Sequence, residues 1–96
     1  MRLELSRRAK SDLDSVRDYS VDNFGVDRAI AYLDAMEQVF RRLLSFPEIG
    51  GPHPALQDGI RSLSCQQHRI FYVIDGKTIR VLRILALSAL RLSPPL

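Results

Sequence analysis

The chain of 96 residues contains one cysteine, few aromatic residues and no long apolar run. A single cysteine cannot form an internal disulfide, which is typical of a protein from a reducing compartment. Without an apolar window of about 18 residues, no transmembrane helix is expected, and charges near the N-terminus interrupt the apolar stretch that a signal peptide requires. We therefore expect a cytoplasmic protein that consists of one domain, residues 1–96.

The familiar motifs of cofactor and metal sites are also missing from the sequence. It has no glycine-rich phosphate loop, no Gly-x-Ser-x-Gly elbow and no paired zinc motif. His53 lies between two prolines, with no carboxylate or cysteine at ligand spacing. Cys65 has no orienting group that would make it a nucleophile. We therefore expect neither a cofactor nor a metal.

Charge is distributed unevenly along the chain, although the net charge is only +3. Residues 1–50 hold eight Lys and Arg against nine Asp and Glu, whereas residues 51–96 hold six against two. The basic half would meet an anionic partner or an acidic protein surface, unless the asymmetry serves solubility alone. A net charge of this size does not by itself indicate a nucleic-acid-binding protein.

The C-terminal half of the chain predicts most of a β-sheet. Two runs rich in Ile, Val, Phe and Tyr are joined through Asp75-Gly76, a dipeptide that favours a tight β-hairpin. The strands are expected near residues 60–65, 68–74 and 78–85.

Side-chain alternation on these strands places arginines among aliphatic residues. On the last strand, Ile79, Val81 and Arg83 would share one face. Such arginines would lie over a concave sheet surface, where their guanidinium groups could bind phosphates or carboxylates of a partner, unless they only solubilise the sheet. The residues expected to contact a partner are Arg61, Arg69, Tyr72, Arg80 and Arg83.

Helical periodicity dominates the N-terminal half. A short alternating strand ends at Ser6, a good N-cap, and an apolar repeat then continues to Gly25, which suits the end of a helix. A second helix, with Asp27 as its N-cap, would end at Pro47. Its apolar face is expected to consist of Ile30, Leu33, Met36, Phe40, Leu43 and Leu44.

The order of these elements predicts an α+β fold. Two helices joined by so short a turn pack antiparallel. We expect an N-terminal strand and an antiparallel two-helix hairpin that packs on a small antiparallel β-sheet. The tail, residues 86–96, is less typical, because two prolines exclude regular structure at its end and its leucines need either a helical turn that packs them or a partner that covers them.

His68, together with Arg61 and Arg83, is the one group of residues that resembles an acid–base site. Cleavage of RNA through its 2′-hydroxyl requires a base, an acid and cations on the phosphate, which His, Tyr and Arg can supply. The alternative is that His68 is a hydrogen-bonded structural residue at the start of a strand.

Several segments, in their order and spacing, resemble the ParE/RelE superfamily of type II toxin–antitoxin toxins, and within it the ParE branch. They span about residues 5–85 and include SRRAKSDLDSVRDYSVDNFG, FPEIG, GIRSL, HRIFYVI and IRVLRIL. The resemblance implies a toxin that a cognate, ParD-like antitoxin neutralises in a hetero-oligomer. ParE-like toxins act on DNA gyrase, whereas RelE-like toxins cut messenger RNA on the ribosome.

Two features favour the ParE branch, in which no catalytic residue is expected. A net charge of +3 is small for a protein that binds ribosomal and messenger RNA. RelE-like nucleases tend to have a catalytic tyrosine after the last strand, and ParE-like chains often have a histidine there. This chain has Ala86, so the set of acid–base residues that a nuclease needs is incomplete. The alternative nuclease would use His68 as base and Arg61 and Arg83 as phosphate clamps. Because the tail departs from the family pattern, an attenuated toxin that still binds antitoxin is a further possibility.

Overall fold

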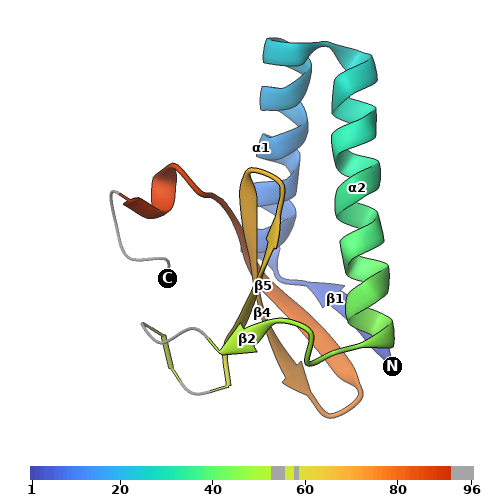
Figure 1. The fold of residues 1–96 in the computed structure, drawn as a ribbon, viewed down its shortest axis with the longest axis vertical. Helices are drawn as coiled ribbons and strands as arrows, with labels where there is room; N and C mark the ends of the chain where they lie inside the picture. The colour runs from blue at the N-terminus through green and yellow to red at the C-terminus, as the bar shows by residue number, and fades with distance from the viewer. Residues whose placement is uncertain (53–55, 58, 92–96) are drawn as a thin grey trace.

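In the computed structural model, a hairpin of two helices packs on one face of a five-stranded sheet (Figure 1), which confirms the predicted α+β fold. The structure describes residues 1–52, 56–57 and 59–91. His53, considered above as a metal ligand, and the end of the tail lie outside these residues. The elements are β1 (Arg2–Leu5), α1 (Arg7–Phe24), α2 (Val26–Ser45), β2 (Gly51–Pro52), β3 (Arg61–Cys65), β4 (His68–Asp75), β5 (Thr78–Ala86) and the 3-10 turn η1 (Ala89–Arg91).

The sheet has the strand order β1-β5-β4-β3-β2. The strands from β2 to β5 pair antiparallel, and the predicted turn between β4 and β5 contains Gly76 at a φ of 59°. The N-terminal strand β1 instead pairs parallel with β5, with Leu5 opposite Val81. The sheet is therefore mixed: the helical hairpin leads from β1 at one edge to β2 at the other, and the antiparallel strands that follow bring β5 back beside β1.

A β-bulge in β5 changes the face on which Arg83 lies. Phe71 is paired with Arg83 and Tyr72 with Val81, so that Leu82 is an extra residue in β5. Val81 and Ile84 consequently both belong to the core beneath the helices. The prediction that Arg83 shares a face with Val81 is wrong, because strict alternation does not hold across a bulge.

The bulge lies at the point along β5 where β1 ends and α1 begins to contact this strand. The backbone N–H of Ser6 donates to Val81 O at 2.9 Å, and its hydroxyl donates to Leu82 O at 2.8 Å. Ser6 is also the N-cap of α1, as predicted, since its Oγ accepts from Ala9 N. Asp27 is not the N-cap of α2: Gly25, at a φ of 86°, is the one residue between the helices, and Asp27 lies in the first turn.

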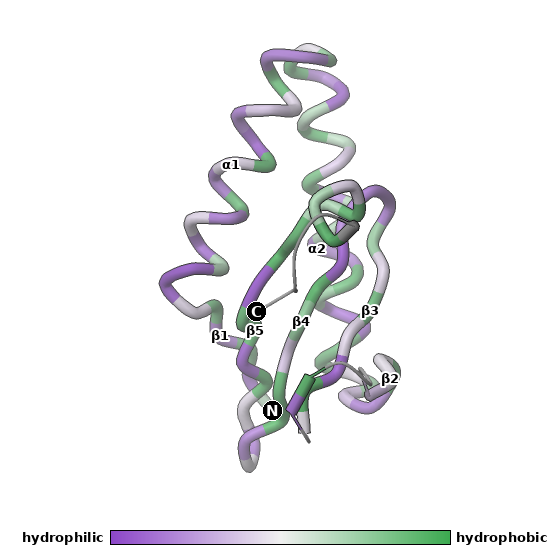
Figure 2. The backbone as a smooth tube through the Cα atoms, turned by 90° about the vertical axis from the view of Figure 1, so that its left-hand side faces the viewer, coloured by the Kyte–Doolittle hydropathy of each residue, from purple (hydrophilic) through white to green (hydrophobic). Residues whose placement is uncertain are grey.

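The core lies between the hairpin and the sheet, and apolar residues are concentrated along β4 and β5 (Figure 2). On α2, Met36 and Leu43 are buried, whereas Ile30 is 54% exposed. The end of the hairpin at the α1–α2 turn extends past the end of the sheet (Figure 1), and Ile30 lies near the start of α2, close to that turn. In the tail, Leu87 and Leu90 are half-buried around η1. Among the described residues, no helix combines the length and apolarity needed to cross a membrane.

Candidate functional site

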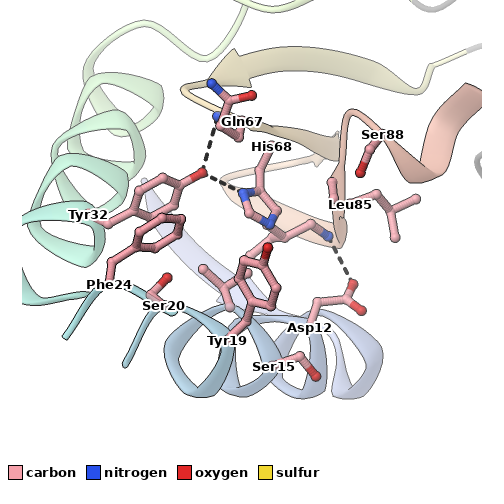
Figure 3. Close-up of a pocket in the computed structure, with 13 residues that line it drawn as sticks. Asp12, Ser15, Tyr19, Ser20, Phe24, Tyr32, Gln67, His68, Leu85 and Ser88 are labelled. Carbon is pink, nitrogen blue, oxygen red and sulfur yellow. Dashed lines mark hydrogen bonds between the residues drawn. The ribbon is translucent and has the colours of Figure 1, made fainter. Parts of the chain in front are cut away.

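A cavity of about 520 Å³ opens between the helical hairpin and the ends of β4 and β5 (Figure 3). We call it the hairpin cavity. Its walls are largely apolar and aromatic, and the residues that line it come from α1, α2, β4, β5 and the segments next to these strands. Its residues include Asp12 and Tyr19 from α1, Tyr32 from α2, His68 from β4, and Leu85 and Ala86 from β5.

His68 is held in this cavity by a tyrosine from α2. The Tyr32 hydroxyl lies 2.5 Å from His68 Nδ1 and accepts from Gln67 N at 3.2 Å. Nδ1 accepts from the hydroxyl when the ring proton is on Nε2 and donates to it when the proton is on Nδ1, and in both cases it is engaged by Tyr32. The rings meet edge to face, with centroids 5.6 Å apart.

The surroundings of this pair keep both side chains neutral near pH 7. Burial lowers the pKa of His68, although the charge of Asp12 acts in the opposite direction. Burial also raises the pKa of Tyr32, against the lowering effect of the Gln67 N–H. His68 is therefore neutral near pH 7, and its Nδ1 is engaged by the Tyr32 hydroxyl.

Arg83 is bound to a carboxylate of α1. Its Nε donates to Asp12 Oδ2 at 2.7 Å and its second terminal nitrogen to Oδ1 at 3.0 Å, while Ile84 N also donates to Oδ2 at 2.9 Å. The two side chains are only 17% and 14% exposed. The hydrogen bond to Asp12 raises the pKa of Arg83. This bidentate pair neutralises the guanidinium and ties α1 to β5.

Tyr72 and Arg61 hold the loop that follows α2. Tyr72 is fully buried; its hydroxyl donates to Pro47 O at 2.7 Å and accepts from Gly50 N at 2.9 Å. Arg61 donates to Gly50 O at 2.6 Å and to Glu48 O at 3.3 Å. Burial raises the pKa of Tyr72. The expectation that Tyr72 contacts a partner does not fit this position, because the register of β4 directs its side chain into the core.

Arg69 and Arg80 have different kinds of partner. Arg69 donates from Nε to Ser62 Oγ at 3.0 Å and from a terminal nitrogen to Ser64 Oγ at 2.9 Å. Arg80 lies 3.7 Å from Glu4 and 3.4 Å from Asp75. Carboxylates therefore balance the charge of Arg80, whereas the two hydroxyls orient Arg69 without neutralising it.

The residues expected to form an acid–base site do not converge. His68 lies in the hairpin cavity, Arg83 is paired with Asp12, and Arg61 is bound to the loop after α2. No cluster of three potential metal ligands occurs among the residues that the structure describes.

Tyr32 and Asp12 are the site residues that sequence reasoning missed. Tyr32 lies between the buried residues Ala29 and Met36 on the inner face of α2, and Asp12 lies between Ala9 and Val16 on α1. A hydroxyl or carboxylate in such a position needs a partner. A polar side chain on the buried face of a helix is therefore the signal that the sequence offers, but it does not identify the partner.

Known toxins match most of this chain. The sequence model of the family described as ParE toxin of type II toxin–antitoxin system, parDE, matches residues 3–88. Toxin ParE3 of Caulobacter vibrioides is 36% identical over 80 residues, which are 83% of this chain and 80% of that protein. Toxin ParE1 of Mycobacterium tuberculosis is 35% identical over 82 residues, 84% of each chain.

Solved structures give the same result for the fold. A chain of the chromosomal ParDE TA system from P. aeruginosa superposes with a TM-score of 0.77 and 26% identity, over 90% of this chain and 95% of that one. A mutant of YafQ from E. coli, at a TM-score of 0.57 and 18% identity over 92% and 94% of the chains, shares the fold. With its N-terminal strand, helical hairpin and bulged sheet, this chain belongs to the ParE toxins of type II toxin–antitoxin systems.

Proposed function

We propose that this chain is a non-catalytic cytoplasmic toxin that inhibits DNA gyrase and is neutralised by a ParD-like antitoxin. One observation carries the non-catalytic part of the proposal: each candidate nuclease residue is already engaged within the molecule. His68 Nδ1 is hydrogen-bonded to Tyr32, Arg83 is paired with Asp12, and Arg61 binds loop carbonyls. An endoribonuclease would need these groups free and convergent on one phosphate.

Arg69 is the sheet residue that we assign to an acidic side chain of the antitoxin. Its hydrogen bonds to Ser62 and Ser64 fix the guanidinium but use neutral acceptors. The remaining N–H groups can bind a carboxylate, for which a pre-oriented guanidinium loses little conformational entropy. Arg80 and Arg83 already have carboxylate partners, so they are weaker candidates.

The distal end of the hairpin is the apolar surface that we assign to the same partner. Tyr19, Phe24, Val26 and Ile30 are each between 54% and 61% exposed. Tyr19 and Phe24 contact each other edge to face and also line the hairpin cavity. Apolar surface of this kind on a small protein marks an interaction site. An antitoxin helix with an apolar face would cover it.

Two assays on the purified chain test gyrase inhibition against RNA cleavage. We expect loss of supercoiling and accumulation of cleaved gyrase–DNA complexes, with messenger RNA intact on translating ribosomes. His68→Ala should then change inhibition by less than roughly tenfold, because no acid–base group is lost. Codon-positioned RNA cuts that His68→Ala reduces by roughly 10²–10⁴-fold would show a nuclease instead.

Expression of the chain alone in cells tests the third possibility. Normal growth at confirmed soluble expression, with antitoxin binding retained, would indicate the attenuated toxin.

A further inference from the structure

The loop that follows α2 exposes apolar side chains at the end of the molecule opposite the α1–α2 turn (Figure 1). Phe46, at the C-cap of α2, is 65% exposed, the highest value among the large apolar side chains of the described residues. It lines an open hollow of about 430 Å³ together with Met1, Pro47, Ile49 and Ile74. We call these five residues the Phe46 patch. Apolar surface gathered in this way on a small protein marks an interaction site.

The turn that presents Phe46 is fixed from inside the fold. Pro47 suits the second position of a β-turn, and Ile49 N donates to Phe46 O at 3.0 Å. From the sheet, the Tyr72 hydroxyl donates to Pro47 O at 2.7 Å, and Arg61 donates at 2.6 Å to the carbonyl just after the turn. Because the backbone is already held in place, binding of Phe46 by a partner would cost little conformational entropy.

The charges next to Phe46 in the chain are opposite in sign and uncompensated. Arg42 lies one helical turn before Phe46, and its carbonyl accepts from Phe46 N at 2.7 Å; Glu48 follows two residues after Phe46. Both side chains are exposed, and within the part of the chain that the structure describes neither has an ion-pair partner, whereas Arg41 is paired with Glu37. An apolar centre flanked by one cation and one anion is complementary to a second copy of itself, because a twofold axis places each charge opposite the other.

We propose that the chain forms a twofold symmetric dimer through the Phe46 patch. Phe46 of each copy packs into the hollow of the other, and Arg42 of each copy pairs with Glu48 of the other. The α1–α2 turn, with its exposed Phe24, then lies at the outer end of each copy and stays free (Figure 1). The dimer is a property of the isolated chain, so it holds or fails independently of the gyrase and antitoxin assignments.

The size of the patch determines how tightly the copies associate. A standard protein interface contains roughly 20–30 residues on each side, far more than the Phe46 patch. We therefore expect a reversible dimer with a dissociation constant of roughly 10–100 µM. Added salt should weaken it, because the charges that pair across the axis are exposed.

Sedimentation equilibrium of the full chain between about 5 and about 500 µM, which spans this range, tests the dimer. Phe46→Asp should raise the dissociation constant by roughly 100-fold, because the twofold contact loses the ring twice. The matched control is Phe24→Asp, which removes a 54% exposed ring at the other end of the molecule and should leave the dissociation constant unchanged. A parent chain that stays monomeric throughout, or a dimer that Phe24→Asp abolishes and Phe46→Asp does not, would overturn the proposal.

Charge reversal tests the twofold pairing without changing the ring. Arg42→Glu alone, or Glu48→Arg alone, places like charges opposite each other and should weaken association by roughly tenfold. An equimolar mixture of these two variants should associate as tightly as the parent chain, because every pair across the axis then joins unlike charges. Single variants that associate like the parent, or a mixture that stays as weak as its components, would contradict this interface.

Discussion

At the scale of single residues, the contact between Gly50 and Tyr72 shows how little space the core leaves. A Cβ atom on Gly50 would lie 2.7 Å from the Tyr72 ring and hydroxyl and 2.8 Å from Ser62 O. The ring is fixed in the core and Ser62 O belongs to the backbone, so neither can turn away. Gly50 is therefore required by close approach, while its neighbour Gly51 has open space where a Cβ would be added.

We predict that Gly50→Ala lowers the free energy of unfolding by about 1–3 kcal/mol, because the added methyl overpacks the Tyr72 contact. The matched control is Gly51→Ala, at an exposed position, which should change it by no more than about 0.5 kcal/mol. Urea denaturation of the two variants beside the parent chain measures both. Equal midpoints for the two variants would show that the loop can move away from Tyr72.

At the scale of elements, α2 buries a narrower stripe than its periodicity indicates. Leu43 is fully buried, whereas the adjacent Leu44 is 37% exposed. Leu43→Ala should destabilise the protein by about 2–5 kcal/mol, because it leaves a cavity under the helix. Leu44→Ala should cost less than about 1 kcal/mol. Thermal or denaturant unfolding distinguishes them, and similar losses would mean that the buried stripe is assigned to the wrong side of α2.

Local signals explain which elements could be predicted from the sequence. Ser6, Gly25 and the Asp75-Gly76 turn act on neighbouring residues, and each forms the predicted boundary or hairpin. The bulge at Leu82 depends on where α1 reaches β5, a contact between residues far apart in the chain. Strand alternation alone could not place it.

The same limit applies to the candidate site. The sequence identified His68 and the sheet arginines as polar residues that need explanation, but their partners come from other elements. Tyr32 is 36 residues before His68, and Asp12 is 71 residues before Arg83. Only the fold shows that these partners satisfy the groups that would otherwise resemble a nuclease centre.

At the scale of the whole molecule, Asp12 joins the helical layer to the sheet. We predict that Asp12→Ala lowers the free energy of unfolding by about 3 kcal/mol, since it leaves a largely buried Arg83 and Ile84 N without their acceptor. Asp14, two positions along α1, pairs with Arg17 while 66% exposed. Asp14→Ala should therefore cost less than about 1 kcal/mol. Chemical denaturation at neutral pH measures the loss in free energy of unfolding for both variants. A small loss for Asp12→Ala would mean that water hydrates the Arg83 guanidinium in place of the carboxylate.

The projecting end of the hairpin determines what a protein bound there would contact. Its free end carries Phe24 and Val26 beyond the sheet, whereas its fixed end is anchored by α1 (Figure 1). Because Phe24 at this end also lines the hairpin cavity together with His68, a protein that binds the free end would contact a wall of that cavity directly.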